Sequence, residues 1–137
     1  MSTSDLINNR DRAKQLLAFD NMKYGLCRPT DIDCSIDFQQ KCFIFVELKS
    51  AGAALTVGQR IHLQGLVDAI VAGGREAYAI LAHHDTPDTE HDVMVSEAVV
   101  HSLYCGDGGR WERILGNKTV DNQIQELYAT YKFNRGK

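Results

Sequence analysis

The sequence predicts an α/β fold in which helices flank a central mixed sheet. Three observations support this prediction. β-branched and aromatic residues are dense in segments 29–37 and 43–49, and a helical pattern at 56–72 leads into the apolar run 77–82. Residues 43–46 are apolar on both faces, as in a strand covered on both sides. With 137 residues, we expect a single domain, residues 1–137, around one core.

Composition narrows the class of protein. Hydrophobic residues make up 44% and charged residues 24% of the chain, which is ordinary for a soluble globular protein. No apolar run reaches transmembrane length and no signal-peptide pattern is present, so we expect a cytoplasmic protein without membrane contact. The net charge of -3 gives no indication of nucleic-acid binding. Basic side chains could still form a local positive rim, among them those of Arg60, Arg75, Arg110 and Arg113.

The first element expected is a helix over residues 4–19, with an apolar side and Asp5 near its start. An exit turn follows at 20–25, and Pro29 pushes the residue before it toward extended geometry.

The next two strands, 29–37 and 43–49, are predicted to form a hairpin around a turn at 38–41. Side chains alternate along a strand, so Asp31 shares a face with Asp33, and Glu47 shares a face with Lys49. A turn centred near Gln40 places Asp33 opposite Glu47 and Asp31 opposite Lys49. All four side chains then converge on one patch of the sheet.

Opposed carboxylates repel each other unless a cation lies between them. A Mg²⁺ ion, with Mn²⁺ as a substitute, is the simplest compensation, since it accepts a few carboxylate oxygens together with waters and phosphate oxygens. The alternative is a solvated edge hairpin with ordinary cross-strand pairs. The apolar approach through residues 43–46 favours the metal site, because unpaired charges are costly at the end of a buried strand.

Thr56 is a candidate N-cap for the helix that runs to about Ala72, and Gly73-Gly74 ends it. Leu63, Leu66, Val67, Ile70 and Val71 form its apolar stripe. Gln59 lies one turn before Leu63, so its amide is either directed at the carboxylate patch or partly exposed in the first turn. The strand 77–82 is expected to lie parallel to 43–49.

The remaining elements are expected as strands at 93–95 and 98–104, a turn at 106–109 and a last helix over 117–133. Trp111 is expected to pack on the core rather than stack on a base. His83, His84 and His91 suggest a metal site, but a polar loop explains them as well. The four cysteines lack C-x-x-C spacing and are expected to be reduced core residues.

Asp33, followed by Glu47-Leu48-Lys49 and by Gln59 on the next helix, resembles the motif of the PD-(D/E)xK nucleases. This restriction-endonuclease-like superfamily includes Holliday-junction resolvases and many phage and repair nucleases. The resemblance covers roughly residues 5–83 and implies an α/β/α sandwich with an αβββαβ core. The small size of the chain suggests a phage or mobile-element origin.

The resemblance implies a Mg²⁺-dependent DNA endonuclease. Asp33, Glu47 and the carbonyl of Leu48 would be metal ligands, Lys49 would position the attacking water, and Gln59 would be an accessory group. Either Asp31 or Asp33 could be the family acid, and opposition across the hairpin favours Asp33. An acid on the first helix, Asp11 or Asp20, is not singled out by the sequence.

Two other hypotheses belong to different classes. One is a catalytically silent module that binds nucleic acid or protein on the same fold, and the other is a histidine metal site with unrelated hydrolase chemistry. The sequence leaves open DNA versus RNA as the substrate and is consistent with a homodimer in which two sites meet two strands.

Overall fold

A computed structural model describes residues 18–27, 29–87, 92–106 and 108–135. For residues 133–135 it describes the backbone and not the side chains. The expected helix over residues 4–19 lies outside the described residues except for its last two positions, which are not helical. The chain divides into two compact units, residues 1–30 and residues 31–137. In the first unit, Tyr24 and Cys27 exchange backbone hydrogen bonds around Gly25, which has a positive φ of 66°.

The second unit contains a five-stranded sheet in the order β1-β2-β3-β4-β5. The strands are β1 (Cys34–Phe38), β2 (Cys42–Ser50), β3 (Glu76–His84), β4 (Val99–Tyr104) and β5 (Glu112–Arg113). Helix α3 (Val57–Ala72) connects β2 to β3, which are parallel as predicted, and the other three strand pairs are antiparallel. The sheet is therefore mixed, and helix α4 (Val120–Arg135) follows it.

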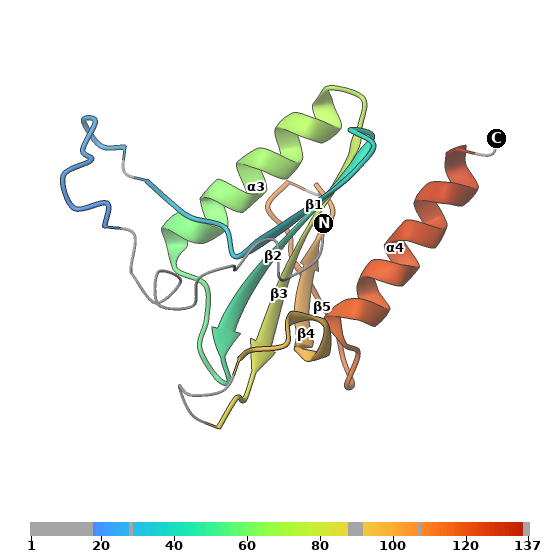
Figure 1. Cartoon of the computed structure of the whole chain (residues 1–137). Coiled ribbons are helices and arrows are strands. Elements are labelled where there is room, and N and C mark those ends of the chain that lie inside the picture. Colours follow the sequence, from blue (N-terminus) through green and yellow to red (C-terminus); the bar gives the residue numbers. More distant parts are fainter. Residues whose placement is uncertain (1–17, 28, 88–91, 107, 136–137) are drawn as a thin grey trace, which may run out of the picture. The chain divides into compact units, whose positions relative to one another are not determined.

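Two apolar clusters cover the two faces of the sheet. Leu63 and Val67 of α3 pack against Phe45 and Ala79, whereas Leu127 and Tyr131 of α4 belong to the cluster that contains Val46 and Ile80. Figure 1 shows α3 and α4 on opposite sides of the strands. The helix–sheet–helix layering agrees with the prediction, but only two strands precede α3 among the described residues, where an αβββαβ core has three.

The hairpin has the predicted register. Cys34 pairs with Val46 and Phe38 with Cys42, so the ladder is in line with Asp33 opposite Glu47. The amide of Lys41 donates to the carbonyl of Phe38 across a tight turn whose central residues, Gln39 and Gln40, have φ values of 57° and 61°. Two positive φ angles define a type I′ turn, whose twist suits a hairpin.

The first strand is shorter than predicted. β1 begins at Cys34, and the chain bends at Asp33. Strict alternation would place Ile32 on the same face as Ile36, yet Ile32 packs with the α3 cluster and Ile36 with the α4 cluster. The expected strand over residues 29–37 was therefore wrong at its start, because the chain crosses to the other face of the sheet at Asp33.

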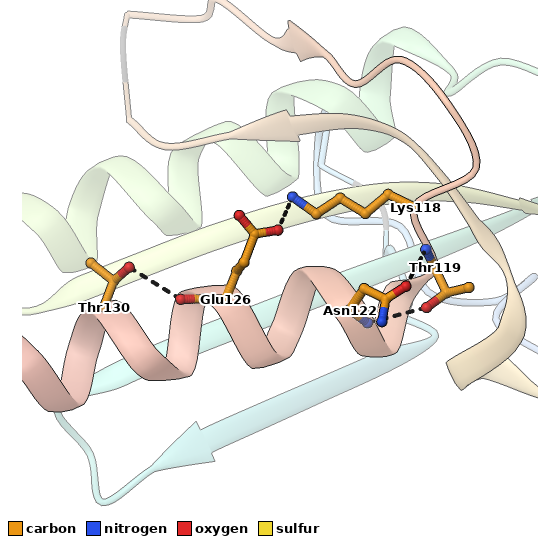
Figure 2. A network of polar contacts seen from close by, with 5 residues as sticks. All are labelled: Lys118, Thr119, Asn122, Glu126 and Thr130. Atoms are coloured by element: carbon orange, nitrogen blue, oxygen red, sulfur yellow. Dashed lines mark hydrogen bonds and ion pairs between the residues drawn. The ribbon is translucent and has the colours of Figure 1, made fainter.

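Helix α4 starts at Val120 rather than at the expected Asn117, because Thr119 caps it. The backbone N–H of Asn122 donates to the Thr119 hydroxyl at 3.1 Å, and the backbone N–H of Thr119 donates to Asn122 Oδ1 at 3.3 Å. Figure 2 shows this reciprocal pair together with the ion pair from Lys118 to Glu126 and the bond from the Thr130 hydroxyl to the Glu126 carbonyl. Such capping supplies partners for amides that the first turn leaves unpaired.

Four other expectations can be compared with the structure. Residues 93–95 are not a strand, since Val95–Glu97 form a short 3₁₀ turn. Val71 of the predicted stripe is exposed. Trp111 packs as predicted, stacked on Tyr104 with its indole N–H donating to Gln64. None of the four cysteines is in a disulfide, and Cys27 and Cys105 are exposed, so the expectation of core residues was wrong for these two.

Within the described part of the chain, no helix combines the length and apolar character needed to cross a membrane.

We predict that Asn and Gly at the two turn positions stabilise the hairpin. Gln39 and Gln40 both occupy the left-handed region, which is unfavourable for most side chains but natural for an Asn-Gly type I′ turn. The Gln39→Asn/Gln40→Gly variant should have a free energy of unfolding higher by about 1 kcal/mol, measured by urea denaturation. A Gln39→Ala/Gln40→Ala variant is the control and should not be stabilised. A lower midpoint for the Asn-Gly variant would contradict the turn assignment.

Candidate functional site

Glu47 is the centre of the candidate site. It lies near the end of β2, and it is only 4% exposed although it carries a carboxylate. Burial of an ionised carboxylate is unfavourable unless partners compensate for the lost water. The residues around Glu47 therefore decide what the site can do.

Asp33 is anchored beside Glu47 by a backbone hydrogen bond. The Leu48 amide donates to Asp33 Oδ2 at 2.8 Å, which replaces the ladder bond that a longer β1 would have made. In an antiparallel pair, a residue's N–H and C=O point to the same side. The Leu48 carbonyl therefore points to the side of β2 where the ladder with β1 has ended.

Gln59 connects the start of α3 to Glu47. The side-chain Oε1 of Gln59 accepts from the backbone N–H of Thr56 at 3.2 Å, and the backbone N–H of Gln59 donates to the Thr56 hydroxyl at 3.1 Å. This reciprocal pair is a capping box, as expected for an N-cap at Thr56. Because Oε1 takes the backbone donor, Nε2 is left to donate to Glu47 Oε1, at 3.2 Å. The helix cap thus fixes the Gln59 amide in the orientation that the carboxylate needs.

Lys49 and Asp31 complete the group of four charged residues. Lys49 is partly buried two residues beyond Glu47 on the same face of β2, and Asp31 is exposed. Both act on the pKa of Glu47, Lys49 lowering it and Asp31 raising it. The predicted convergence is therefore present, although Asp31 and Asp33 precede the ladder instead of belonging to it.

The charges at the site are not balanced. The pKa of Glu47 is raised from 4.5 to about 7, first because the side chain is buried and second because Asp33 carries a like charge. Lys49 and the backbone amide of Asp33 act in the opposite direction and only partly compensate. A further cation at this position would restore the ionised form of Glu47.

The donor set fits a small hard cation. Asp33 and Glu47 supply two carboxylates that repel each other electrostatically, and carboxylate oxygens are ligands that Mg²⁺ accepts. Among the described residues no three His, Cys, Asp or Glu side chains form a metal-binding group. Mg²⁺ does not need one, since it is commonly bound through one or two carboxylates and retains several waters.

The histidine hypothesis has less support. His83 Nε2 contacts the Ala53 carbonyl at 2.6 Å, whereas His84 Nδ1 contacts the Thr86 hydroxyl at 3.2 Å. Neighbouring residues of a strand face opposite sides of the sheet, so these two imidazoles do not converge on one ion. His91 lies outside the described residues.

Sequence reasoning missed two features of this region. The bond from the Leu48 amide to Asp33 depends on a bend that strand propensity does not reveal. His101 was not singled out at all, and it reaches the sheet face of Glu47 through a bulge between β3 and β4, where Leu81 pairs with Ser102 but Ala82 pairs with Val100.

No family model matches the chain, and no curated protein or solved structure shows a significant match. The resemblance to PD-(D/E)xK nucleases therefore depends on the residues of the hairpin and of α3 alone.

We predict that Glu47 makes the metal-free protein less stable as the pH rises. The folded state retains a proton on Glu47 that the unfolded state loses, so the free energy of unfolding should fall between about pH 4.5 and pH 7 and level off above it. The expected decrease is on the order of 2 kcal/mol. Urea denaturation in EDTA across this range measures it.

In the Glu47→Gln variant the free energy of unfolding should not show the decrease that Glu47 causes between about pH 4.5 and pH 7. The control variant Asp121→Asn, which removes an exposed carboxylate on α4, should retain this decrease. Identical pH dependence in wild type and Glu47→Gln would rule out the raised pKa.

Proposed function

We propose that this protein is a Mg²⁺-dependent endonuclease that hydrolyses phosphodiester bonds in DNA, with the specific fold of the PD-(D/E)xK nucleases. The observation that carries the proposal is the buried carboxyl of Glu47, held beside Asp33 by contacts from two other elements. A purely structural carboxylate would be expected to have its own cationic partner. Here the Lys49 ammonium only partly offsets the effect of burial and of Asp33.

In this proposal Asp33, Glu47 and the Leu48 carbonyl hold the metal. Bound Mg²⁺ would polarise the scissile phosphate and lower the pKa of a coordinated water. Gln59 donates to Glu47 Oε1 and so restrains the carboxylate that would hold the metal. Asp33 is similarly restrained by the Leu48 amide. The protein thereby positions its ligands before the substrate arrives, which reduces the cost of organising the transition state.

Lys49 has the role of positioning the attacking water and countering the negative charge that develops on the phosphoryl oxygens. The water oxygen forms a new bond to phosphorus while the ester bond to the leaving oxygen breaks in line with it. The water proton passes to solvent and the leaving oxygen gains a proton. The partly buried position of Lys49, two residues from Glu47 on the same face, suits this role.

We predict that Glu47→Ala abolishes cleavage of supercoiled plasmid in Mg²⁺ or Mn²⁺. The substitution removes a ligand and also relieves repulsion from Asp33, so thermal stability measured without metal should be unchanged or higher. The matched control is Asp121→Asn, because Asp121 is an exposed acid on α4, across the sheet from the site, and this variant should cleave at the wild-type rate.

A Glu47→Ala protein that cleaves at the wild-type rate would refute the assignment. Wild-type protein that binds DNA and never cleaves it, under any divalent metal, would instead favour the silent binding module.

A further inference from the structure

A groove lined by three basic side chains, those of His83, His101 and Arg113, begins at the strand next to Glu47. Its volume is about 350 Å³, and it opens between the loop after β2 and strands β3 to β5. We call it the His–Arg groove and define it by the lining residues used below, which are Ala53, Ala54, Leu81, His83, His101 and Arg113. The proposed nuclease mechanism uses none of them.

The groove begins one strand away from the proposed catalytic residues. On the parallel strands β2 and β3, Leu81 is the partner of Glu47 and His83 is the partner of Lys49. Paired residues share a sheet face, and neighbouring strands lie about 4.8 Å apart. The groove therefore starts about 5 Å from the carboxylates and extends one or two further strand spacings across the same face.

Backbone contacts fix the cationic side chains in the groove. Arg113 Nη1 donates to the carbonyls of His101 and Ile114, at 2.9 and 2.8 Å. His83 Nε2 donates to the Ala53 carbonyl, and its ring stands edge-on to that of His101 with centroids 5.1 Å apart. Nη2 of Arg113 has no carboxylate partner among the residues that the structure describes, so the guanidinium retains donors for a ligand.

Electrostatics indicate the sign of that ligand. Burial lowers the pKa of His101, and the nearby Arg113 and His83 lower it further, because a positive charge on His101 is unfavourable beside these basic groups. An anion in the groove would relieve this crowding, as a cation would relieve the crowding of Asp33 and Glu47. Two adjacent sites on one sheet face thus favour ligands of opposite charge.

We propose that the His–Arg groove binds a phosphodiester group of the DNA backbone, one or two nucleotides from the bond that is cleaved. This inference rests on the proposed nuclease function and adds a substrate contact to it. Arginine suits the role because its planar guanidinium donates two parallel hydrogen bonds to a phosphate. The contact fixes the register of the strand and carries no sequence information.

The test measures DNA binding with two pairs of variants of the full chain. Arg113→Gln is compared with Arg75→Gln, which removes an exposed arginine just before β3. Arg113 is level with Leu81 across the sheet, and Arg75 lies six residues before Leu81, about 20 Å along β3 at about 3.3 Å per residue. Ala54→Glu is compared with Ala54→Gln, which has nearly the same shape without the charge and preserves every arginine contact. Anisotropy of a fluorescein-labelled duplex gives the affinity over a range of salt concentrations, in Ca²⁺ and again in EDTA.

Arg113→Gln should weaken binding at least about 5-fold relative to Arg75→Gln and reduce the slope of log K against log salt by about 1. Ala54→Glu should bind more weakly than Ala54→Gln. The proposal is overturned if Arg113→Gln and Ala54→Glu bind as tightly as their controls with unchanged slopes, or if the wild type binds no duplex in either condition.

Plasmid cleavage by the same samples separates this proposal from the nuclease proposal. If cleavage requires Glu47 but DNA affinity is unchanged in Arg113→Gln and Ala54→Glu, the groove proposal is overturned and the nuclease proposal stands. Binding that depends on Arg113 in a wild-type protein that never cleaves supports the groove and overturns the nuclease.

Discussion

The desolvated carboxyl of Glu47 beside Asp33 is the constraint on which the rest of the site depends. Glu47 is the last of four consecutive buried residues of β2, Ile44 to Glu47, so its carboxyl is largely removed from water. The surrounding structure restrains both carboxylates through Leu48 and Gln59. Burial, and after it the like charge of Asp33, raises the pKa of Glu47 to about 7. Residues that are held in an electrostatically unfavourable arrangement are candidates for function.

The fold explains how this arrangement persists. Apolar clusters on both faces hold β2 and β3 in place, and the cap of α3 at Thr56 is also the support of Gln59. Helix stability and carboxylate orientation therefore share the same hydrogen bonds. Across the sheet, the β3–β4 bulge brings His101 onto the face that carries Glu47, which places cationic groups next to the acidic ones.

Much of this arrangement could be predicted from local sequence rules. The turn at Gln39-Gln40 predicted the pairing, and alternation placed Glu47 and Lys49 together. Helical spacing left Gln59 either directed at the carboxylates or partly exposed, and the structure shows it bonded to Glu47. The bend at Asp33 could not be predicted, because it depends on the competition between a ladder bond and a side-chain bond to the Leu48 amide. The groove around His101 and Arg113 was also hidden, since its residues meet only after β3, β4 and β5 have paired.

The most direct test of this account is the pKa of Glu47 itself, measured by carbon-13 NMR of its side-chain carboxyl with and without Mg²⁺. We predict a value of about 7 in the metal-free protein and a substantial decrease when Mg²⁺ is added, because the cation stabilises the ionised carboxylate. The decrease should be lost in Asp33→Ala, which removes the second carboxylate. A Glu47 pKa near 4.5 that Mg²⁺ does not change would contradict the account.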